Sequence, residues 1–292
     1  MSIRGIAIAL AVLAGALVCD IPAGAQPSDS SPDPRAALER IAESLVDVPM
    51  PKGAVGRAYI ARPQGDGPFP AVVLLHGTAG FVTSYVPMAD AFAAAGFVAV
   101  AGCWFKGNHM PPGFPTPPIL PCPKGAAFDG ANLKTVENAR AIIDFARGLP
   151  GVAPDRVAVW GHSRGGTAAL FLAVTDAPVR AVVAAAPIYA YPKREGTYRD
   201  DFPILYLSKI KVPVLMLQGT SDQIIPVSEA REFEAAARAA SLALEAQYYE
   251  GEGHSLFFQG PQRDAARDRA IAFLRKTLVS SGTDEKEVPI PR

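Results

Sequence analysis

Cysteine, histidine and unbalanced charge are scarce in this sequence. Its 292 residues include 3 cysteines and 4 histidines, and 28 basic side chains balance 28 acidic ones. This balance argues against a nucleic-acid surface or an acidic tail. No His/Cys cluster has metal-site spacing, and the glycine-rich stretch over residues 161–167 lacks the lysine with which a P-loop holds phosphate. We therefore expect no nucleic-acid partner, no cofactor, and a small neutral or weakly charged substrate.

The sequence also lacks an apolar run of the roughly 20 residues that a membrane-spanning helix needs. Arg4 precedes a shorter apolar run over residues 6–18, and Ala23-Gly24-Ala25 provides small residues suited to cleavage. These features predict a secretory signal peptide over residues 1–25, cut before Gln26. The mature protein is then expected in the periplasm or outside the cell, with no membrane association after cleavage.

Two alternatives to a cleaved signal peptide stay open. The apolar run could remain as an uncleaved anchor, although it is short for one. Cys19 could carry a lipid, although Val18 is bulkier than the small residue that lipoprotein cleavage sites place before the cysteine. Beyond the signal peptide, we interpret residues 26–50 as a linker and a short amphipathic helix, 51–280 as one domain, and 281–292 as a flexible tail.

From residue 54 onward, predicted strands alternate with predicted helices. Residues 71–75 form a continuous apolar run, which is typical of a strand buried on both faces, and residues 214–219 are predicted to form another buried strand. Residues 55–61 alternate in hydropathy, so we expect an edge strand there. The alternation of strands and helices predicts an α/β fold with a mostly parallel, twisted sheet and helices on both faces, and a chain of this length fits one such domain.

Residues 158–167, Ala-Val-Trp-Gly-His-Ser-Arg-Gly-Gly-Thr, are predicted to form a strand that turns sharply into a helix. Gly161, Ser163 and Gly165 make the G-x-S-x-G pattern of a nucleophile elbow. The two glycines let strand and helix approach closely while the serine Oγ is exposed at the corner. The first helical amide, that of Arg164, is aimed to donate to a developing oxyanion. The alternative is a glycine-rich structural turn.

A second glycine-rich turn, His76-Gly77-Thr78-Ala79-Gly80, follows the predicted buried strand at 71–75. Such a turn can leave backbone N–H groups unpaired and directed outward, as the second donor of an oxyanion hole requires. We assign that donor to Thr78. The alternative is a tight turn with His76 as a packed histidine.

Asp222 and His254 come directly after predicted strands over residues 214–219 and 244–249. Because the carboxyl ends of parallel strands share one rim of a sheet, both side chains are expected on the rim that carries Ser163. The chain order serine, aspartate, histidine is the one that α/β-hydrolases use. The pattern predicts a catalytic triad with a serine nucleophile, a histidine base and an aspartate that orients the base.

The acid of this triad has two competitors, Asp200 and Asp201, which also lie between the predicted nucleophile and the predicted base. They belong to an aromatic segment over residues 187–211 rather than to a strand end, so they cannot be positioned as rigidly. The aromatic side chains of this segment could line an apolar pocket or simply pack the core. We therefore assign the acid to Asp222.

Residues 102–124 are crowded with prolines, which excludes a helix or an inner strand. Trp104 and Phe105 favour a loop packed near the site over a solvated one. Once the signal peptide is removed, Cys103 and Cys122 are the remaining cysteines, and an oxidising compartment makes an even pair prone to bridge. We predict a disulfide between them; the alternative is a buried free thiol at Cys103.

The sequence resembles the α/β-hydrolase superfamily from about Val55 to Val279, and within it the dienelactone-hydrolase-like branch. The resemblance rests on three strings: residues 161–166 (GHSRGG), residues 218–222 (QGTSD) and Gly253-His254. It implies an α/β-hydrolase fold without a large cap domain.

Dienelactone hydrolases proper carry a cysteine at the elbow and a controlling glutamate upstream. Here the elbow carries Ser163, and no glutamate lies between Gly53 and His76. With this difference, the resemblance implies a secreted serine carboxylesterase that cleaves small-molecule esters through an acyl-enzyme and needs no cofactor. One alternative is a serine peptidase of the prolyl-oligopeptidase type, for whose usual propeller the chain has no room. Another is a binding protein on a hydrolase scaffold.

Overall fold

The structure is a computed structural model that describes residues 34–107, 120–122, 136–189 and 203–279. These residues belong to one compact unit that begins at Pro34. The predicted signal peptide and the predicted C-terminal tail lie outside the described residues, so both stay predictions. Within the described ranges, no helix has the length and hydropathy to cross a membrane.

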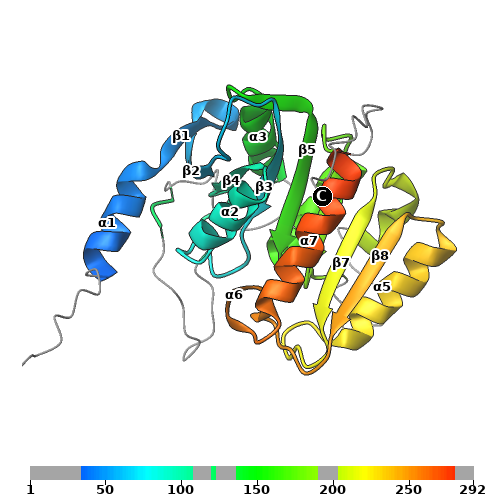
Figure 1. Cartoon of the computed structure of the whole chain (residues 1–292). Coiled ribbons are helices and arrows are strands. Elements are labelled where there is room, and N and C mark those ends of the chain that lie inside the picture. Colours follow the sequence, from blue (N-terminus) through cyan, green and yellow to red (C-terminus); the bar gives the residue numbers. More distant parts are fainter. Residues whose placement is uncertain (1–33, 108–119, 123–135, 190–202, 280–292) are drawn as a thin grey trace, which may run out of the picture. The chain divides into compact units, whose positions relative to one another are not determined.

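The described part of the chain contains an eight-stranded sheet with the order β1-β2-β4-β3-β5-β6-β7-β8 (Figure 1). β2 runs antiparallel to β1 and β4, and all other neighbours are parallel. The mostly parallel sheet that the alternating pattern predicts is therefore confirmed. The strands are β1 (Val46–Pro49), β2 (Val55–Ala61), β3 (Phe69–Leu75), β4 (Val98–Gly102), β5 (Val152–His162), β6 (Ala181–Ala185), β7 (Val214–Gly219) and β8 (Leu244–Tyr249).

Helices cover both faces of this sheet. Glu245 and Tyr248 lie three apart in β8 and so point to opposite faces; Glu245 pairs with Arg269 of α7, and Tyr248 donates to Glu234 of α5. α2 packs on the α7 side and α3 and α4 on the α5 side. The helices are α1 (Pro34–Ser44), α2 (Tyr85–Ala94), α3 (Val136–Arg147), α4 (Arg164–Val174), α5 (Val227–Ala239), α6 (Leu256–Gln259) and α7 (Arg263–Leu278), with 3-10 turns η1 (Pro51–Gly53) and η2 (Pro203–Lys209).

The core lies on both sides of the central strands. Every residue of β4, β6 and β7 is buried. These strands are runs of Val, Ala, Leu and Met, with few side chains that need a hydrogen-bond partner. Continuous apolar runs are the pattern expected for strands buried on both faces, and the structure confirms this reading.

The prediction of an edge strand at residues 55–61 is wrong. β2 is the second strand of the sheet, and the edge is β1, which lies within the 26–50 stretch interpreted as linker and helix. β1 has only four residues, too few for a hydropathy period to reveal it. The alternation in β2 arises because one face of this strand is only partly covered, and not because the strand lies at an unpaired edge of the sheet.

The candidate site lies where the strand order reverses around β3. From β3 the chain moves to β4 on one side, and then returns by α3 to β5 on the other side of β3. Ligand sites of open α/β sheets form at such a reversal, beyond the carboxyl ends of the strands. The turn after β3 and the elbow after β5 are therefore neighbours.

Candidate active site

Ser163 occupies a strained turn between β5 and α4. Its φ and ψ are 55° and −120°, a region that residues other than glycine rarely adopt. A side chain at Gly161 would collide with the carbonyl group of Gly165, and one at Gly165 would collide with that of Leu75. Glycine at both positions therefore lets strand and helix meet at this corner, which is the geometry of a nucleophile elbow.

Ser163 packs closely against the turn that follows β3. The residue as a whole is 5% exposed. A Cβ atom at Gly77 in that turn would stand only 3.1 Å from the Cβ of Ser163. The turn that carries Thr78 thus lies directly against the serine, and a residue larger than glycine at position 77 would be crowded there.

Asp222 and His254 are hydrogen-bonded to each other at the carboxyl ends of β7 and β8. Nδ1 of His254 donates to Oδ2 of Asp222 at 2.8 Å. Because Nδ1 carries the proton of the neutral ring, Nε2 is left as the acceptor that a general base needs. No hydrogen bond between described residues joins this Nε2 to Ser163 Oγ; in hydrolases such bonds often tighten only when substrate binds.

The Asp222 carboxylate is buried among donors. Its Oδ1 accepts from the N–H groups of Ile224 and Ile225 at 2.8 and 2.9 Å. Its Oδ2 also accepts from Gln218 Nε2 at 3.0 Å. Burial alone would raise the pKa of Asp222, but the bonds from His254 and the two amides outweigh it and hold the pKa below its ordinary value. The carboxylate therefore stays ionised, as orienting a catalytic histidine requires.

Thr78 and Arg164, the predicted oxyanion donors, are joined through their side chains. Nε of Arg164 donates to Oγ1 of Thr78 at 3.0 Å. Arg164 begins α4, so its backbone N–H belongs to the first turn, where N–H groups lack intrahelical acceptors. Within the described ranges the Thr78 N–H makes no hydrogen bond. The side-chain bond between Arg164 and Thr78 therefore links the two segments whose backbone amides are the predicted donors.

Removing the Thr78 hydroxyl should slow ester hydrolysis although the backbone donor remains. Thr78→Val keeps the side-chain shape but cannot accept from Arg164, so the turn loses its tie to the elbow. We expect kcat on a nitrophenyl ester to fall about tenfold with KM little changed, since a misplaced donor weakens transition-state binding alone. Thr78→Ser keeps the acceptor and should retain more activity; equal loss in both variants would contradict a role for this bond.

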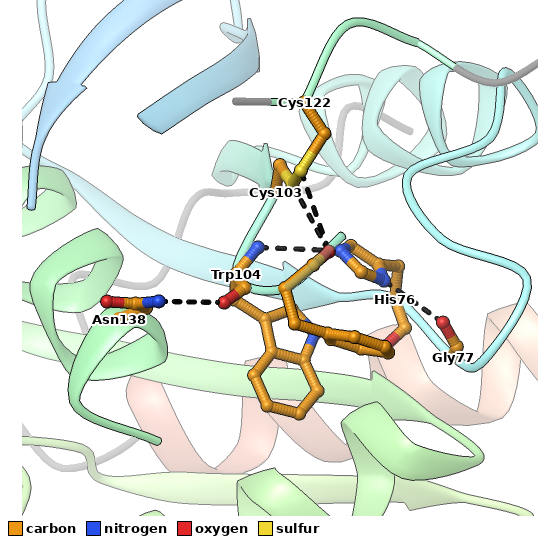
Figure 2. The surroundings of a disulfide bond; sticks show 7 residues. His76, Gly77, Cys103, Trp104, Cys122 and Asn138 are labelled. Atoms are coloured by element: carbon orange, nitrogen blue, oxygen red, sulfur yellow. Dashed lines mark hydrogen bonds between the residues drawn. A yellow bond between two sulfur atoms is a disulfide. The ribbon is translucent and has the colours of Figure 1, made fainter. Parts of the chain in front are cut away.

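The turn that carries Thr78 is supported from behind by buried aromatic residues (Figure 2). Nδ1 of His76 donates to the Gly77 carbonyl at 3.0 Å, and its Nε2 accepts the Trp104 N–H at 3.4 Å. The Trp104 indole donates to the His76 carbonyl at 3.0 Å, and Asn138 Nδ2 donates to the Trp104 carbonyl at 3.1 Å. His76 is thus a packed histidine that supports the turn with both ring nitrogens.

Acid should destabilise the fold through buried histidines. Burial lowers the pKa of His76 from 6.5 to about 4, and burial together with the nearby His254 lowers that of His162 to about 3. The unfolded chain titrates near the ordinary value and so binds more protons below pH 6.5. The stability that these neutral histidines contribute is therefore fully present above pH 6.5 and is lost as the pH falls toward 4. At pH 4.5 each histidine accounts for a loss of at most about 3 kcal/mol in the free energy of unfolding.

Urea unfolding at pH 7 and pH 4.5 measures this loss. Acid also protonates carboxylates, so the contribution of one histidine needs a variant that lacks it. His162→Gln cannot titrate at this position and should lose less stability over the interval than the wild type does. The same loss in both proteins would show that His162 is not held neutral in the fold.

Cys103 and Cys122 form the predicted disulfide. Their Cα atoms lie 5.7 Å apart at a sequence separation of 19, a spacing normal for such bonds. Both sulfurs lie near the Phe105 carbonyl oxygen, at 3.3 and 3.5 Å. Trp104 and Phe105 are buried against His76, so the start of the proline-rich loop is packed beside the site, as predicted. Most of that loop lies outside the described residues.

Reducing this disulfide should lower stability more than it slows the reaction. Cross-linking a loop of this size removes unfolded-state entropy worth about 3 kcal/mol. The bonds of Trp104 to His76 and Asn138 do not depend on the sulfurs, so the turn should remain in place. We expect a lower Tm in the Cys103→Ala/Cys122→Ala double variant, with kcat within a few-fold. Intact mass after alkylation without reductant is the direct check, and two alkylated thiols in exported protein would contradict the bridge.

Sequence reasoning missed three residues that support the site. Gln218 donates to Asp222 and accepts from Tyr189 OH at 3.1 Å; its only signal is a polar residue in an apolar run. The buried Glu252 carboxylate accepts the Gln262 N–H at 2.6 Å, and so anchors the loop before the histidine to the start of α7. His162, inside the elbow motif, contacts the backbone of His254.

Several predicted features cannot be placed. Asp200 and Asp201, the competing acids, lie outside the described residues, so the choice of Asp222 over them stays a prediction. Of the aromatic segment, Tyr189 is buried against Phe233, and Tyr206 packs on Phe171. For these two side chains the structure favours core packing. In the described ranges, no group of three or more His, Cys, Asp or Glu side chains could hold a metal ion.

The profile of the dienelactone hydrolase family matches residues 57–278. The chain belongs to the dienelactone hydrolase family. A curated relative from Bradyrhizobium sp is named "Probable 2-oxo-3-(5-oxofuran-2-ylidene)propanoate lactonase"; it is 28% identical over 231 residues, which cover 79% of this chain and 90% of that protein. The match confirms the predicted family and makes the protein a member of a family of hydrolases.

Solved structures show the same fold. A thermophilic esterase from the Planctomycetes species Thermogutta terrifontis matches with a TM-score of 0.64 at 18% identity, over 82% of this chain and 96% of its own. An acylaminoacyl peptidase from Pyrococcus horikoshii matches with a TM-score of 0.66 at 14% identity, over 82% of this chain and 42% of its own. At these identities the likeness concerns the fold alone. It confirms the α/β-hydrolase fold for this family member, and no large cap domain is present among the described residues.

Proposed function

We propose that this member of the dienelactone hydrolase family is a serine carboxylesterase that hydrolyses small-molecule esters through an acyl-enzyme. The observation that carries the proposal is the hydrogen-bonded Asp222–His254 pair on the same rim of the sheet as the strained elbow of Ser163. A nucleophile, a base and a group that orients the base are the three parts that acyl transfer by a serine requires.

The reaction begins when Ser163 Oγ attacks the ester carbonyl carbon and His254 Nε2 takes its proton. The ionised carboxylate of Asp222 holds the ring in the tautomer that leaves Nε2 free to accept, and stabilises the imidazolium that forms. The imidazolium then gives the proton to the departing alcohol, which leaves an acyl-serine. Water, activated by the same histidine, attacks this ester, and collapse releases the acid and restores the serine.

Charge that develops on the substrate oxygen needs donors placed in advance. We assign this role to the backbone N–H groups of Thr78 and Arg164, each worth on the order of 3 kcal/mol of barrier in a typical oxyanion hole. The side-chain bond between the two residues supports the assignment because it fixes the spacing of the two segments. A preformed pair of donors needs no reorganisation during the reaction, which is why it favours the transition state.

The other two readings have less support. The peptidase from Pyrococcus horikoshii matches at 14% identity and over only 42% of its own length, so this likeness concerns the fold and gives a peptidase activity no support. A pure binding protein has no need of a strained serine or of an ionised aspartate paired with a histidine. The strained turn costs stability, and catalysis explains both features.

A series of nitrophenyl esters of rising acyl length, followed by stopped flow, tests the proposal. An acyl-enzyme predicts a burst of nitrophenol equal to the concentration of active sites when deacylation is the slower step. A small lactone belongs in the same panel, because the name of the Bradyrhizobium relative concerns a cyclic ester. No hydrolysis above the buffer rate for any of these esters would contradict the proposed function.

We also propose that the enzyme is exported and that its signal peptide is removed near Ala25. The apolar run over residues 6–18 and the small residues before Gln26 support this. The disulfide agrees with an oxidising compartment. Intact mass of protein recovered from outside the cytoplasm should correspond to a chain that begins at Gln26; a mature chain that begins at Met1 would contradict it.

A further inference from the structure

His162 connects the nucleophile elbow to the loop that carries His254. It is the last residue of β5, directly before Ser163, and it is 8% exposed. Its Nε2 lies 3.0 Å from the backbone carbonyl oxygen of His254. Because a carbonyl oxygen can only accept, Nε2 of His162 carries the proton and donates it. The neighbour of the proposed nucleophile thus binds the backbone of the proposed base.

This hydrogen bond ties the loop to a part of the sheet that the other hydrogen bonds of the loop do not reach. The loop is also attached to the turn after β7, where Ser221 N donates to the Glu252 carbonyl at 2.9 Å. That attachment fixes the loop relative to Asp222. Among the described residues, the bond from His162 to His254 is the one hydrogen bond that ties the loop to β5 and its elbow.

The ring of His162 is held in one orientation and in one charge state. Its centroid lies 4.8 Å from that of His254, and Phe257 and Phe258 pack edge-on against it at 5.6 and 5.1 Å. Burial, and next the proximity of His254, lower the pKa of His162 to about 3, against the opposing effects of the bond to the His254 carbonyl and of the Asp222 charge. The ring therefore stays neutral while His254 becomes an imidazolium, so no second positive charge opposes that step.

We propose that His162 is a positioning residue, whose Nε2–H bond to the His254 carbonyl holds the His254 imidazole within reach of Ser163 Oγ. The inference rests on the proposed function, because it assumes that these two residues are base and nucleophile. Proton transfer between them needs a separation of roughly 2.6–3.2 Å. A misplacement of about 1 Å can reduce a rate about 100-fold.

Two substitutions separate the hydrogen bond from the bulk of the ring. His162→Phe keeps an aromatic ring but has no donor, whereas His162→Gln carries an amide N–H2 at a similar reach. We expect kcat per active site to fall about 10- to 100-fold in His162→Phe, with KM little changed, and most of the loss to be recovered in His162→Gln. Titration with a fluorophosphonate counts active sites, so misfolded protein does not enter kcat.

A matched core variant controls for general loss of stability. Phe92 is fully buried and packs edge-on against Phe97, near the amino ends of the strands and away from the elbow. Phe92→Leu should lower Tm but leave kcat per active site unchanged. A purely structural role for His162 predicts the same behaviour for His162→Phe.

Wild-type kcat per active site in His162→Phe would overturn the inference, as would a His162→Gln variant no better than His162→Phe. If His162→Phe does not fold, His162→Asn replaces it, because its amide is on a stem too short to reach the carbonyl; equal kcat in His162→Asn and His162→Gln then overturns the inference. Failure of the proposed function has a different signature. In that case the fluorophosphonate would titrate no site in the wild type, and Ser163→Ala would hydrolyse esters as fast as the wild type does.

Discussion

Replacing Ser163 with alanine is expected to remove ester hydrolysis while the protein stays folded. The substitution deletes only Oγ, so the Cβ remains at the same φ of 55° and the Ser163 N–H bond to the Ala185 carbonyl is unaffected. Without Oγ no acyl-enzyme can form. We expect kcat to fall by on the order of 10⁴-fold or more, toward the background left by binding and the oxyanion donors alone.

Hydrolysis of a nitrophenyl ester, read beside the Tm, checks this expectation. Ser228→Ala, in the first turn of α5, is the matched control, because it removes the same atom from an exposed serine outside the elbow. It should leave both quantities near their wild-type values. Activity in Ser163→Ala comparable to that of the control would refute the proposed mechanism.

Asp222→Asn should lower kcat by on the order of 10⁴-fold, as loss of the orienting aspartate does in another triad. The reason is the tautomer of His254. An asparagine amide can turn its NH2 group toward Nδ1, which must then accept, so the proton moves to Nε2 and the base can no longer take the serine proton. The bonds that the carboxylate receives from Ile224 and Ile225 can still be made by the remaining amide oxygen.

The competing acid provides the control. Asp201→Asn makes the same chemical change in the aromatic segment and should leave kcat within a few-fold of the wild type. If Asp201→Asn proved the damaging substitution and Asp222→Asn the mild one, the assignment of the acid would be wrong. KM should change little in Asp222→Asn, because the carboxylate is buried behind His254 rather than open to substrate.

Features encoded by short-range patterns could be read from the sequence. The predicted strands at 214–219 and 244–249 coincide with β7 and β8, because burial on two faces or one imposes its period on every residue. The elbow could be predicted for the same reason. A side chain at Gly161 or Gly165 would collide with backbone a few residues from Ser163 or with the adjacent strand, so the motif itself records the requirement for glycine. Chain order and strand ends then sufficed to place Asp222 and His254 on one rim.

Features that depend on contacts distant in sequence could not be read. β1 is recognisable only by its pairing with β2, and four residues carry too little pattern to predict it. The close approach of Gly77 to Ser163 depends on how two turns distant in sequence pack together. The bond between His162 and His254 joins residues that are 92 positions apart, and nothing in the elbow motif distinguishes a histidine that points toward the base from one that packs in the core.

If Ser163 is the nucleophile of an esterase, it should carry the covalent adduct of a serine-directed probe, and mapping this adduct is the decisive measurement. A fluorophosphonate reacts with an activated serine and stays attached, so peptide mass spectrometry identifies the residue modified. We predict one adduct per chain, on Ser163, formed rapidly in the wild type, much more slowly in Asp222→Asn and not at all in Ser163→Ala. An adduct on another residue, or none on Ser163 in enzyme that hydrolyses esters, would show that Ser163 is not the nucleophile.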